Sequence, residues 1–152
     1  MTVQPVTIVA NGKTAANLKL ELKDAQGNPI SGDKVDFTTS LTNSQIKNTK
    51  EVGNGVYTAE LTGITAGEST ISVKINGSVL KNKTAKVVLT ADSDNPSPTK
   101  SKLEAKPDKI MADRKVVSTL KLTLQDVNGN LISGQSVQFN TTLANSTTTP
   151  VT

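Results

Sequence analysis

The 152-residue sequence predicts an all-β fold, an antiparallel β-sandwich present in tandem repeat. Three observations support this prediction. Apolar and polar residues alternate along most of the chain, turn signals separate the alternating segments, and the second half of the chain repeats the first. The sequence shows no helical periodicity, and it has no apolar run of about 18 residues, the length needed to cross a membrane. We therefore expect no direct membrane insertion.

The clearest alternation lies at residues 18–22, where three leucines alternate with charged residues. One face of such a strand is buried and the other faces water. Similar segments lead us to expect about seven short strands, at residues 7–10, 18–22, 35–37, 46–50 (the weakest), 56–61, 71–75 and 86–89. Seven strands with closely spaced turns are typical of an immunoglobulin-like sandwich. The Cys…Trp…Cys signature of antibody domains is absent, so only the architecture is predicted.

The second half of the chain repeats the first at an offset of 102 residues, which places Asp24 against Asp126. Residues 18–44 (LKLELKDAQGNPISGDKVDFTTSLTNS) align without gaps on residues 120–146 (LKLTLQDVNGNLISGQSVQFNTTLANS). A period this long is typical of whole domains in tandem, each with its own core. We expect a complete immunoglobulin-like domain at 1–91, a linker at 92–101, and the truncated N-terminal half of a second repeat at 102–152.

The linker is rich in Asp, Asn, Pro and Ser, and its Pro-Ser-Pro stretch predicts a semi-rigid, extended connector. Asp92, Asp94 and Asn95 carry oxygens of the kind that Ca²⁺ prefers. Calcium needs about six to eight oxygen ligands, however, and the next acidic residues, Glu104 and Asp108, would have to fold back to reach it. We therefore expect a solvated linker without metal or cofactor, with a structural calcium ion as the alternative.

The composition argues against catalysis, because the chain has no Cys and no His. The thiol nucleophile and the commonest general base near neutral pH are both missing, so we expect no enzyme and no catalytic residue. The net charge of +4 comes from 17 Lys and Arg residues against 13 Asp and Glu residues. All but one of these cations are lysines spread along both halves, so no basic patch for nucleic acid is expected.

Three further side chains could carry a function, and each has a structural interpretation that we favour. Asp24 and Asp126 end a strand before a Gly-Asn pair, where we expect each carboxylate to cap its own turn rather than to act in catalysis. Tyr57 could be a surface contact. We expect instead that its ring packs into the sandwich and that its hydroxyl forms a hydrogen bond at the edge.

Several blocks of sequence resemble one known family. They are KDAQGNPISGDKVDF and GNGVYTAELTGITAGESTISVKING in the first repeat, QDVNGNLISGQSVQF in the second, and the opening IVANGKT with its equivalent IMADRKV. These blocks are similar to the bacterial immunoglobulin-like repeats of intimin- and invasin-type adhesins, and the resemblance covers residues 3–91 and the available part of the second repeat. It implies an extracellular stalk at the bacterial cell surface, anchored to the outer membrane through a region outside this chain.

In that family the repeats act as spacers, and receptor binding usually lies in distinct domains at the far end of the stalk. Those end domains include a lectin-like module with cysteines, and nothing in this chain matches one, so no receptor-binding residue carries over. The resemblance thus implies a non-enzymatic spacer that supports attachment to host cells or surfaces. Its partners would be neighbouring repeats of the same parent chain, with a host-cell receptor bound only through other domains.

Two alternatives remain open at this point. The chain could be a receptor- or carbohydrate-binding module, or an accessory domain of a secreted enzyme or phage tail protein. Rigid aromatic side chains dominate binding hot spots. The chain has only Phe37, Tyr57 and Phe139, so the spacer is favoured.

The truncated second repeat carries its own prediction. It keeps the leucine strand, the turn, and a strand through Val137 and Phe139, but not the strands that would cover them. We expect the apolar side chains of Leu120, Leu122, Leu124 and Val137 to be exposed, and exposed strand edges invite pairing. Residues beyond about 102 are therefore expected to be poorly ordered or completed by another chain through self-association.

Overall fold

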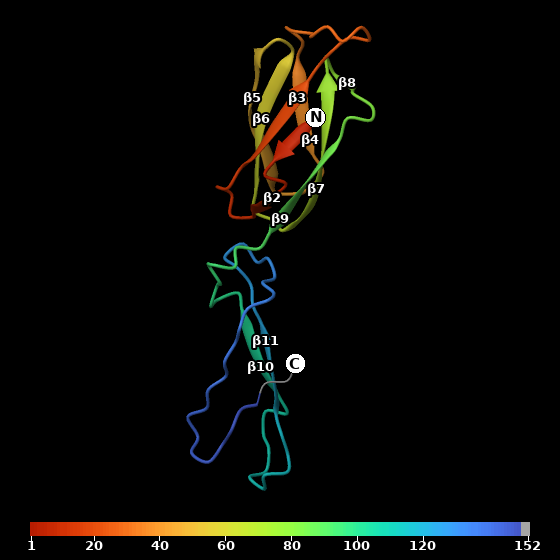
Figure 1. Ribbon diagram of the computed structural model, residues 1–152. Coiled ribbons are helices and arrows are strands. Elements are labelled where there is room, and N and C mark those ends of the chain that lie inside the picture. Colours follow the sequence, from red (N-terminus) through yellow and green to blue (C-terminus); the bar gives the residue numbers. More distant parts are fainter. Residues whose placement is uncertain (150–152) are drawn as a thin grey trace.

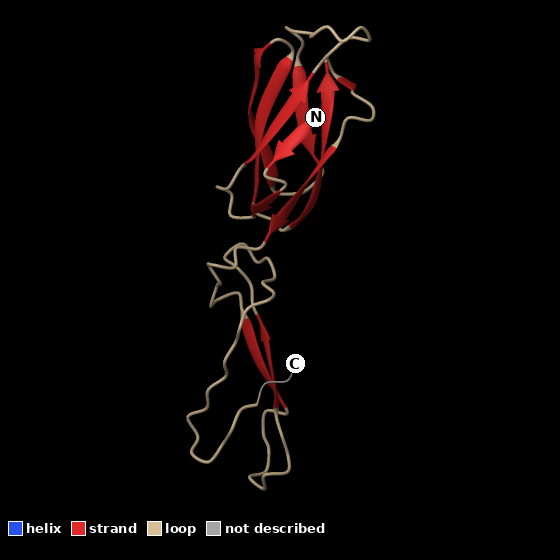
Figure 2. Cartoon of the chain, viewed as in Figure 1, coloured by secondary structure: helices blue, strands red, loops and turns tan. Residues whose placement is uncertain are grey.

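The computed structural model of the protein describes residues 1–149. Figure 1 shows an elongated chain in which one unit follows the other end to end. We call residues 1–91 the first unit, residues 92–101 the linker and residues 102–149 the second unit. Figure 2 shows that strands dominate the first unit and that loops make up most of the second. In this part of the chain no helix is long and apolar enough to span a membrane.

The first unit is a sandwich of two sheets, which confirms the predicted immunoglobulin-like fold. One sheet has the order β1 (Thr2–Gln4), β3 (Ala16–Glu21), β6 (Val56–Gly63) and β5 (Ser44–Gly53). The other has the order β2 (Thr7–Val9), β9 (Ala85–Thr90), β7 (Gly67–Ile75) and β4 (Val35–Thr39), with β8 (Ser78–Val79) beside β7. All pairings are antiparallel except that of β2 with β9, which is parallel.

Alternate residues of these strands fill the space between the two sheets. Strand β3 buries every second residue and exposes the others. Strand β6 likewise buries Tyr57, Ala59 and Leu61, and the residues between them are half-buried. The core cluster is completed by apolar residues of β2, β4, β7 and β9. Burial of one such aliphatic side chain contributes about 1.5–3 kcal/mol. The leucines that alternate in the sequence are therefore among the side chains that hold the two sheets together.

All seven expected strands are present, and the weakest prediction, at 46–50, lies within the ten-residue strand β5. The sequence did not reveal β1 and β8, which have only three and two residues. A strand this short shows no measurable alternation, so it can be recognised only from the partner strand that it joins.

The prediction for Tyr57 is confirmed. Its ring is buried, and its hydroxyl contacts the loop between β3 and β4. Figure 1 shows this loop at the end of the first unit that faces away from the linker. There the hydroxyl donates a hydrogen bond to the carbonyl oxygen of Ile30 at 3.3 Å and accepts one from the amide of Asp33 at 3.1 Å. This single side chain therefore ties the long loop between β3 and β4 to the core.

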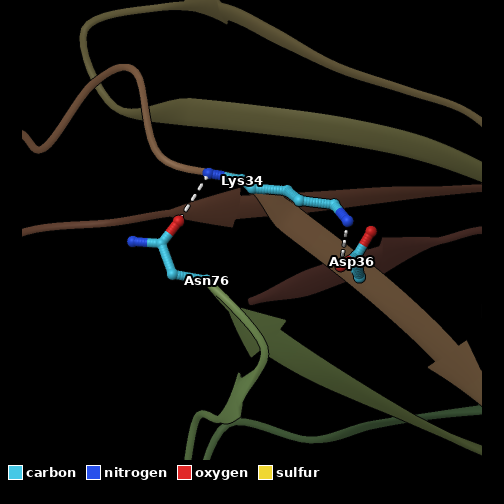
Figure 3. A network of polar contacts seen from close by, with 3 residues as sticks. All are labelled: Lys34, Asp36 and Asn76. Atoms are coloured by element: carbon cyan, nitrogen blue, oxygen red, sulfur yellow. Dashed lines mark hydrogen bonds and ion pairs between the residues drawn. The ribbon is translucent and has the colours of Figure 1, made fainter.

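Asn76 holds the same loop from the opposite sheet, as Figure 3 shows. Its side-chain oxygen accepts a hydrogen bond from the Lys34 amide at 3.0 Å, and its side-chain nitrogen donates to Asp33 at 2.9 Å. Asn76 has a φ of +48°, a left-handed conformation that asparagine tolerates better than most residues. The Lys34–Asp36 ion pair in this view is exposed and 3.7 Å long. Such surface pairs contribute little.

The second unit repeats the start of the first. Strand β10 (Lys102–Lys106) pairs with β11 (Thr119–Thr123), in the position that β1 and β3 hold in the first unit. Ala105 lies opposite Leu120, as Val3 lies opposite Leu18, so the register is the same at the 102-residue offset.

Two expectations for the second unit were wrong. Val137 and Phe139 do not lie in a strand, because the equivalent strand β4 depends on a ladder with β7, and the described residues of the second unit supply no such partner. Leu122 and Leu124 are half-buried, whereas Leu120 and Val137 are exposed as expected.

The half-buried leucines line an open apolar groove of about 380 Å³, which is completed on its other side by the segment that contains Ile132, Val137 and Phe139. The chain thus runs back beside its own leucine strand and leaves that face open. Poor order of this unit, or its completion by another chain, stays a prediction.

Candidate inter-repeat interface

The linker was expected to be extended and solvated. Most of its residues are exposed, as expected, but its extended conformation was predicted wrongly. It contains two turns, at residues 93–94 and 98–100, and it buries Asp92 and Ser97. The amide of Ser97 donates a hydrogen bond to the carbonyl oxygen of Gln125 at 2.7 Å. Short polar side chains such as those of Asp, Asn and Ser offer the backbone local hydrogen bonds, and they favour turns over an extended chain. The linker is therefore folded onto the second unit.

Two of the linker residues considered for calcium, Asp92 and Asn95, bond to each other, whereas Asp94 is exposed. The Asp92 carboxylate accepts a hydrogen bond from the side-chain amide of Asn95 at 3.0 Å. No group of three or more Asp, Glu, His or Cys residues that could hold a metal ion occurs within residues 1–149. The absence of a calcium site stays a prediction, and the hydrogen bond between Asp92 and Asn95 assigns these two side chains to the folding of the linker.

The junction itself is built by the turn at residues 126–130, which we call the docking turn. Its first residue, Asp126, caps the turn as predicted: one carboxylate oxygen accepts the amides of Asn128 and Asn130, both at 2.9 Å. The other carboxylate oxygen accepts the side-chain amide of Asn130 at 2.8 Å. Gly129 has a φ of +89°, a backbone conformation that glycine adopts at no steric cost. The conformation of the turn is thus held by bonds within the second unit, independently of its contacts with the first.

Asn130 makes the direct contact with the loop that joins β6 to β7 in the first unit. Its side-chain oxygen accepts the amide of Ala66 at 2.7 Å, and its side-chain nitrogen donates to the carbonyl oxygen of Ile64 at 3.0 Å. The same nitrogen also bonds Asp126, so both of its protons are used. Asparagine suits this position because it carries a donor and an acceptor side by side.

Two further bonds complete the junction, one on either side of Asn130. The side-chain amide of Asn128 donates to the carbonyl oxygen of Ala10, at the end of β2, at 3.0 Å. The amide of Asp92, where the chain leaves β9, donates to the second carboxylate oxygen of Asp126 at 3.0 Å. The groups that receive the docking turn, in the first unit and at the start of the linker, are therefore all main-chain atoms.

The Asp126 carboxylate lies fully buried at this junction. Burial by itself raises the pKa of such a group. The hydrogen bonds from the Asn130 side chain and from the amides of Asp92, Asn130 and Asn128 outweigh it and lower the pKa below its ordinary value. A buried carboxylate with four hydrogen bonds is stable as the anion, and removing it would leave its donors unpaired.

The first unit contains the same turn at residues 24–28, which we call the free turn. Asp24 caps it as predicted, accepting the amides of Gln26 at 2.9 Å and Asn28 at 2.8 Å and the Asn28 side chain at 2.9 Å. These bonds lower the pKa of Asp24, and the bond from the Asn28 side chain contributes most to this shift. The free turn lies exposed at the end of the first unit that faces away from the linker.

Sequence reasoning predicted the capping of both turns, but not the docking of one of them. The available signal was an asparagine that the free turn lacks: Asn128 of the docking turn has Gln26 as its equivalent in the first unit. This difference alone does not indicate an interface, since the residues contacted are 64 to 118 positions away.

The two sheets, the repeated strand pair and the polar junction define a tandem immunoglobulin-like repeat protein whose units are joined end to end. The family described as "Invasin, domain 3" matches residues 1–92 and 97–152. The chain belongs to this family, and both units contribute to the match.

Three proteins illustrate the similarity. The inverse autotransporter adhesin YeeJ of Escherichia coli (strain K12) is 28% identical over 141 residues, which cover 91% of this chain and 6% of YeeJ. The crystal structure of invasin, described as a bacterial integrin-binding protein, gives a TM-score of 0.75 at 34% identity and covers 89% of this chain and 27% of that one. The structure of InvD of Yersinia pseudotuberculosis gives a TM-score of 0.67 at 33% identity. The match covers 87% of this chain and 38% of InvD.

The chain therefore spans well under half the length of each of these relatives. Its sequence is of the type found in the domains of bacterial inverse autotransporter adhesins.

Proposed function

We propose that this chain is a non-enzymatic spacer in the extracellular stalk of a bacterial outer-membrane adhesin, where it holds neighbouring repeats end to end and supports attachment through other domains. The observation that carries the proposal is the junction: the docking turn makes three hydrogen bonds to the first unit and a fourth to the start of the linker. A spacer needs a defined angle between its units. A junction with a buried, fully bonded carboxylate supplies that angle better than a free linker does.

The surface chemistry supports a spacer rather than a receptor-binding module. Phe37 and Tyr57 are buried and Phe139 is half-buried, so the three aromatic side chains offer no exposed cluster. Exposed aromatic and Arg side chains dominate protein-binding hot spots, and Arg114 is the single arginine of the sequence. The lack of His and Cys argues in the same direction against an enzyme.

Small-angle X-ray scattering of the full chain, combined with a binding assay, tests the proposal. We expect a scattering profile of an elongated particle with one preferred angle between the units, and no saturable binding to host cells or to a glycan array. Invasin, which is described as integrin-binding, serves as the positive control for cell binding. Saturable, competable binding by this chain would contradict the spacer role, as would a profile that requires a broad distribution of angles between the two units.

The second unit also leaves an apolar groove open among residues 120–139. We include in the proposal that this face associates with another copy of the chain when no further strands cover it, because exposed strand edges beside apolar faces pair readily. Sedimentation velocity over a range of concentrations tests this point. A chain that stays monomeric at high concentration contradicts the self-association and leaves the spacer role intact.

A further inference from the structure

The free turn at one end of the first unit matches the docking turn that contacts its other end. Three side chains carry the bonds of the docking turn across the junction, and their equivalents in the free turn are Asp24, Gln26 and Asn28. The aspartate and the last asparagine are unchanged between the two turns, and in the docking turn they hold three of the four bonds. Gln26 offers the same amide as Asn128 on a side chain one methylene longer.

The free turn also has the geometry of the docked one without any partner. Its three internal hydrogen bonds agree with those of the docking turn to within 0.1 Å, and Gly27 and Gly129 share a φ of +89°. The loop behind it is held firmly, because Gly32 donates to the Glu51 carboxylate at 2.9 Å and Gly55 donates to the Ser31 hydroxyl at 3.0 Å. A surface that is already ordered loses little entropy when it binds.

The internal bonds use only part of the hydrogen-bonding capacity of the free turn. In the docking turn, the second carboxylate oxygen of Asp126 takes one more amide, and the Asn130 side chain takes one amide and one carbonyl. The corresponding groups of Asp24 and Asn28 have no protein partner in the described part of the chain, and both residues are exposed.

We propose that the free turn is a second docking element, which inserts into the end loops of a preceding immunoglobulin-like repeat of the same type. This inference rests on the proposed function, since it requires a stalk of consecutive repeats. The groups that the preceding repeat must present are the two carbonyls and two amides that receive the docking turn, those of Ala10, Ile64, Ala66 and Asp92. The two ends of the first unit are thus complementary, and unlike ends that fit each other generate an open linear array.

A tandem chain tests this directly. Residues 1–102 are joined ahead of Met1 of the full chain, which keeps the 102-residue period and places the end loops of the added unit before the free turn. The added unit brings the complete core cluster of the first unit, whose buried members all lie between Ile8 and Leu89. Isotope labelling of the added segment alone lets amide hydrogen exchange be read at its own Ala66 and Asp92. The natural junction of the full chain gives the reference rates.

We expect the Ala66 and Asp92 amides of the added unit to exchange at least about tenfold more slowly in the tandem chain than in residues 1–102 alone. Asp24→Ala and Asn28→Ala in the tandem chain should each abolish this protection. Gln26→Asn, which copies the docking turn, should keep it. Unprotected amides in the tandem chain, or protection that survives both alanine variants, would overturn the proposal.

Two controls separate the possible failures. Asp24→Ala in the chain without the added unit must keep the fluorescence and amide spectrum of a folded first unit. If Asp24→Ala unfolds the first unit, the docking of the free turn is judged instead from amide protection in the Asn28→Ala tandem chain and in the unsubstituted tandem chain. A mobile new junction beside an ordered natural one overturns the docking role of the free turn alone and leaves the spacer function standing. If the natural junction is mobile as well, the spacer proposal fails with it.

Discussion

The two repeats bury opposite parts of nearly the same sequence. In the first unit the leucine strand is buried between two sheets and the turn after it is exposed. In the second unit Leu120 is exposed on an open face, while Asp126 of the turn is fully buried against the first unit. The local conformation is the same in both, down to strand register and turn hydrogen bonds. For the leucine strand and the turn after it, local sequence therefore determines the conformation, whereas the neighbouring unit determines which of the two is buried.

The largest expected difference lies in the leucine strands. Leu20→Ala should lower the free energy of unfolding of the first unit by about 3 kcal/mol, since a buried leucine is replaced by a cavity. Leu122→Ala should lower the stability of the second unit by less than about 1 kcal/mol, because that side chain is only half-buried.

Urea unfolding followed by Tyr57 fluorescence measures the first unit specifically, as Tyr57 is the single tyrosine and the chain has no tryptophan. Amide exchange along β11 reports the second unit. Equal losses in the two variants would mean that another chain covers the leucine face of the second unit in solution.

The next largest difference separates the two aspartates. Asp126→Ala should weaken the junction by about 3 kcal/mol, since it removes a buried anion and leaves the donors that surrounded it unpaired. We expect the Asp92 amide to exchange about 100-fold faster in this variant, at about 1.4 kcal/mol per tenfold. Asp24→Ala in the same chain should leave that exchange rate unchanged. A matching effect of Asp24→Ala would show that the junction depends on the first unit as a whole.

A smaller effect is expected for the asparagines that follow. Asn130→Ala removes the bonds to Ala66 and Ile64 and should weaken the junction by about 1–2 kcal/mol. Asn28→Ala removes one internal bond of an exposed turn and should leave the junction untouched. The Ala66 amide reports the difference by hydrogen exchange, and an unchanged rate in Asn130→Ala would mean that water replaces the asparagine without loss.

The smallest effect concerns acid. The pKa of both Asp24 and Asp126 lies below 3.8 in the folded chain, so each carboxylate contributes stability that is present above about pH 4 and is lost as the pH falls through its folded pKa. An NMR titration should show the Asn130 amide shift moving with a midpoint below 3.8, because this amide donates to the Asp126 carboxylate and its own side chain does not ionise. Asp126→Asn should remove that transition and Asp24→Asn should not. A midpoint above 3.8 would mean that burial of Asp126 outweighs its hydrogen bonds.

Much of the fold could be predicted because alternation is a local signal. Residues 18–22 and 56–61 show it plainly, and both are strands. The failed prediction of a strand through Val137 and Phe139 has the opposite cause. Alternation indicates that a segment can join a sheet, but a ladder of hydrogen bonds also needs a partner strand. The described residues of the second unit contain no partner strand for this segment.

The junction could be predicted only in part. The capping by Asp126 follows from its position before Gly129 and Asn130, so the local chemistry was available in the sequence. The docking was not, because its receiving atoms belong to the backbone of Ala10 and to the loop after β6, and a main-chain group has no sequence signature. The extended conformation of the linker was predicted wrongly for a related reason. It was inferred from the prolines alone, without the second unit onto which the linker folds.

The parallel pairing of β2 with β9 has a mechanical consequence. These two strands lie beside each other at Thr7–Val9 and Val88–Thr90, and the carbonyl of Val6 and the amide of Ala10 extend the ladder. Tension along the stalk pulls the start of β2 and the end of β9 in opposite directions. The load therefore acts as shear along the ladder, so its hydrogen bonds must break together rather than one after another. The unit is thus arranged to bear traction along its long axis.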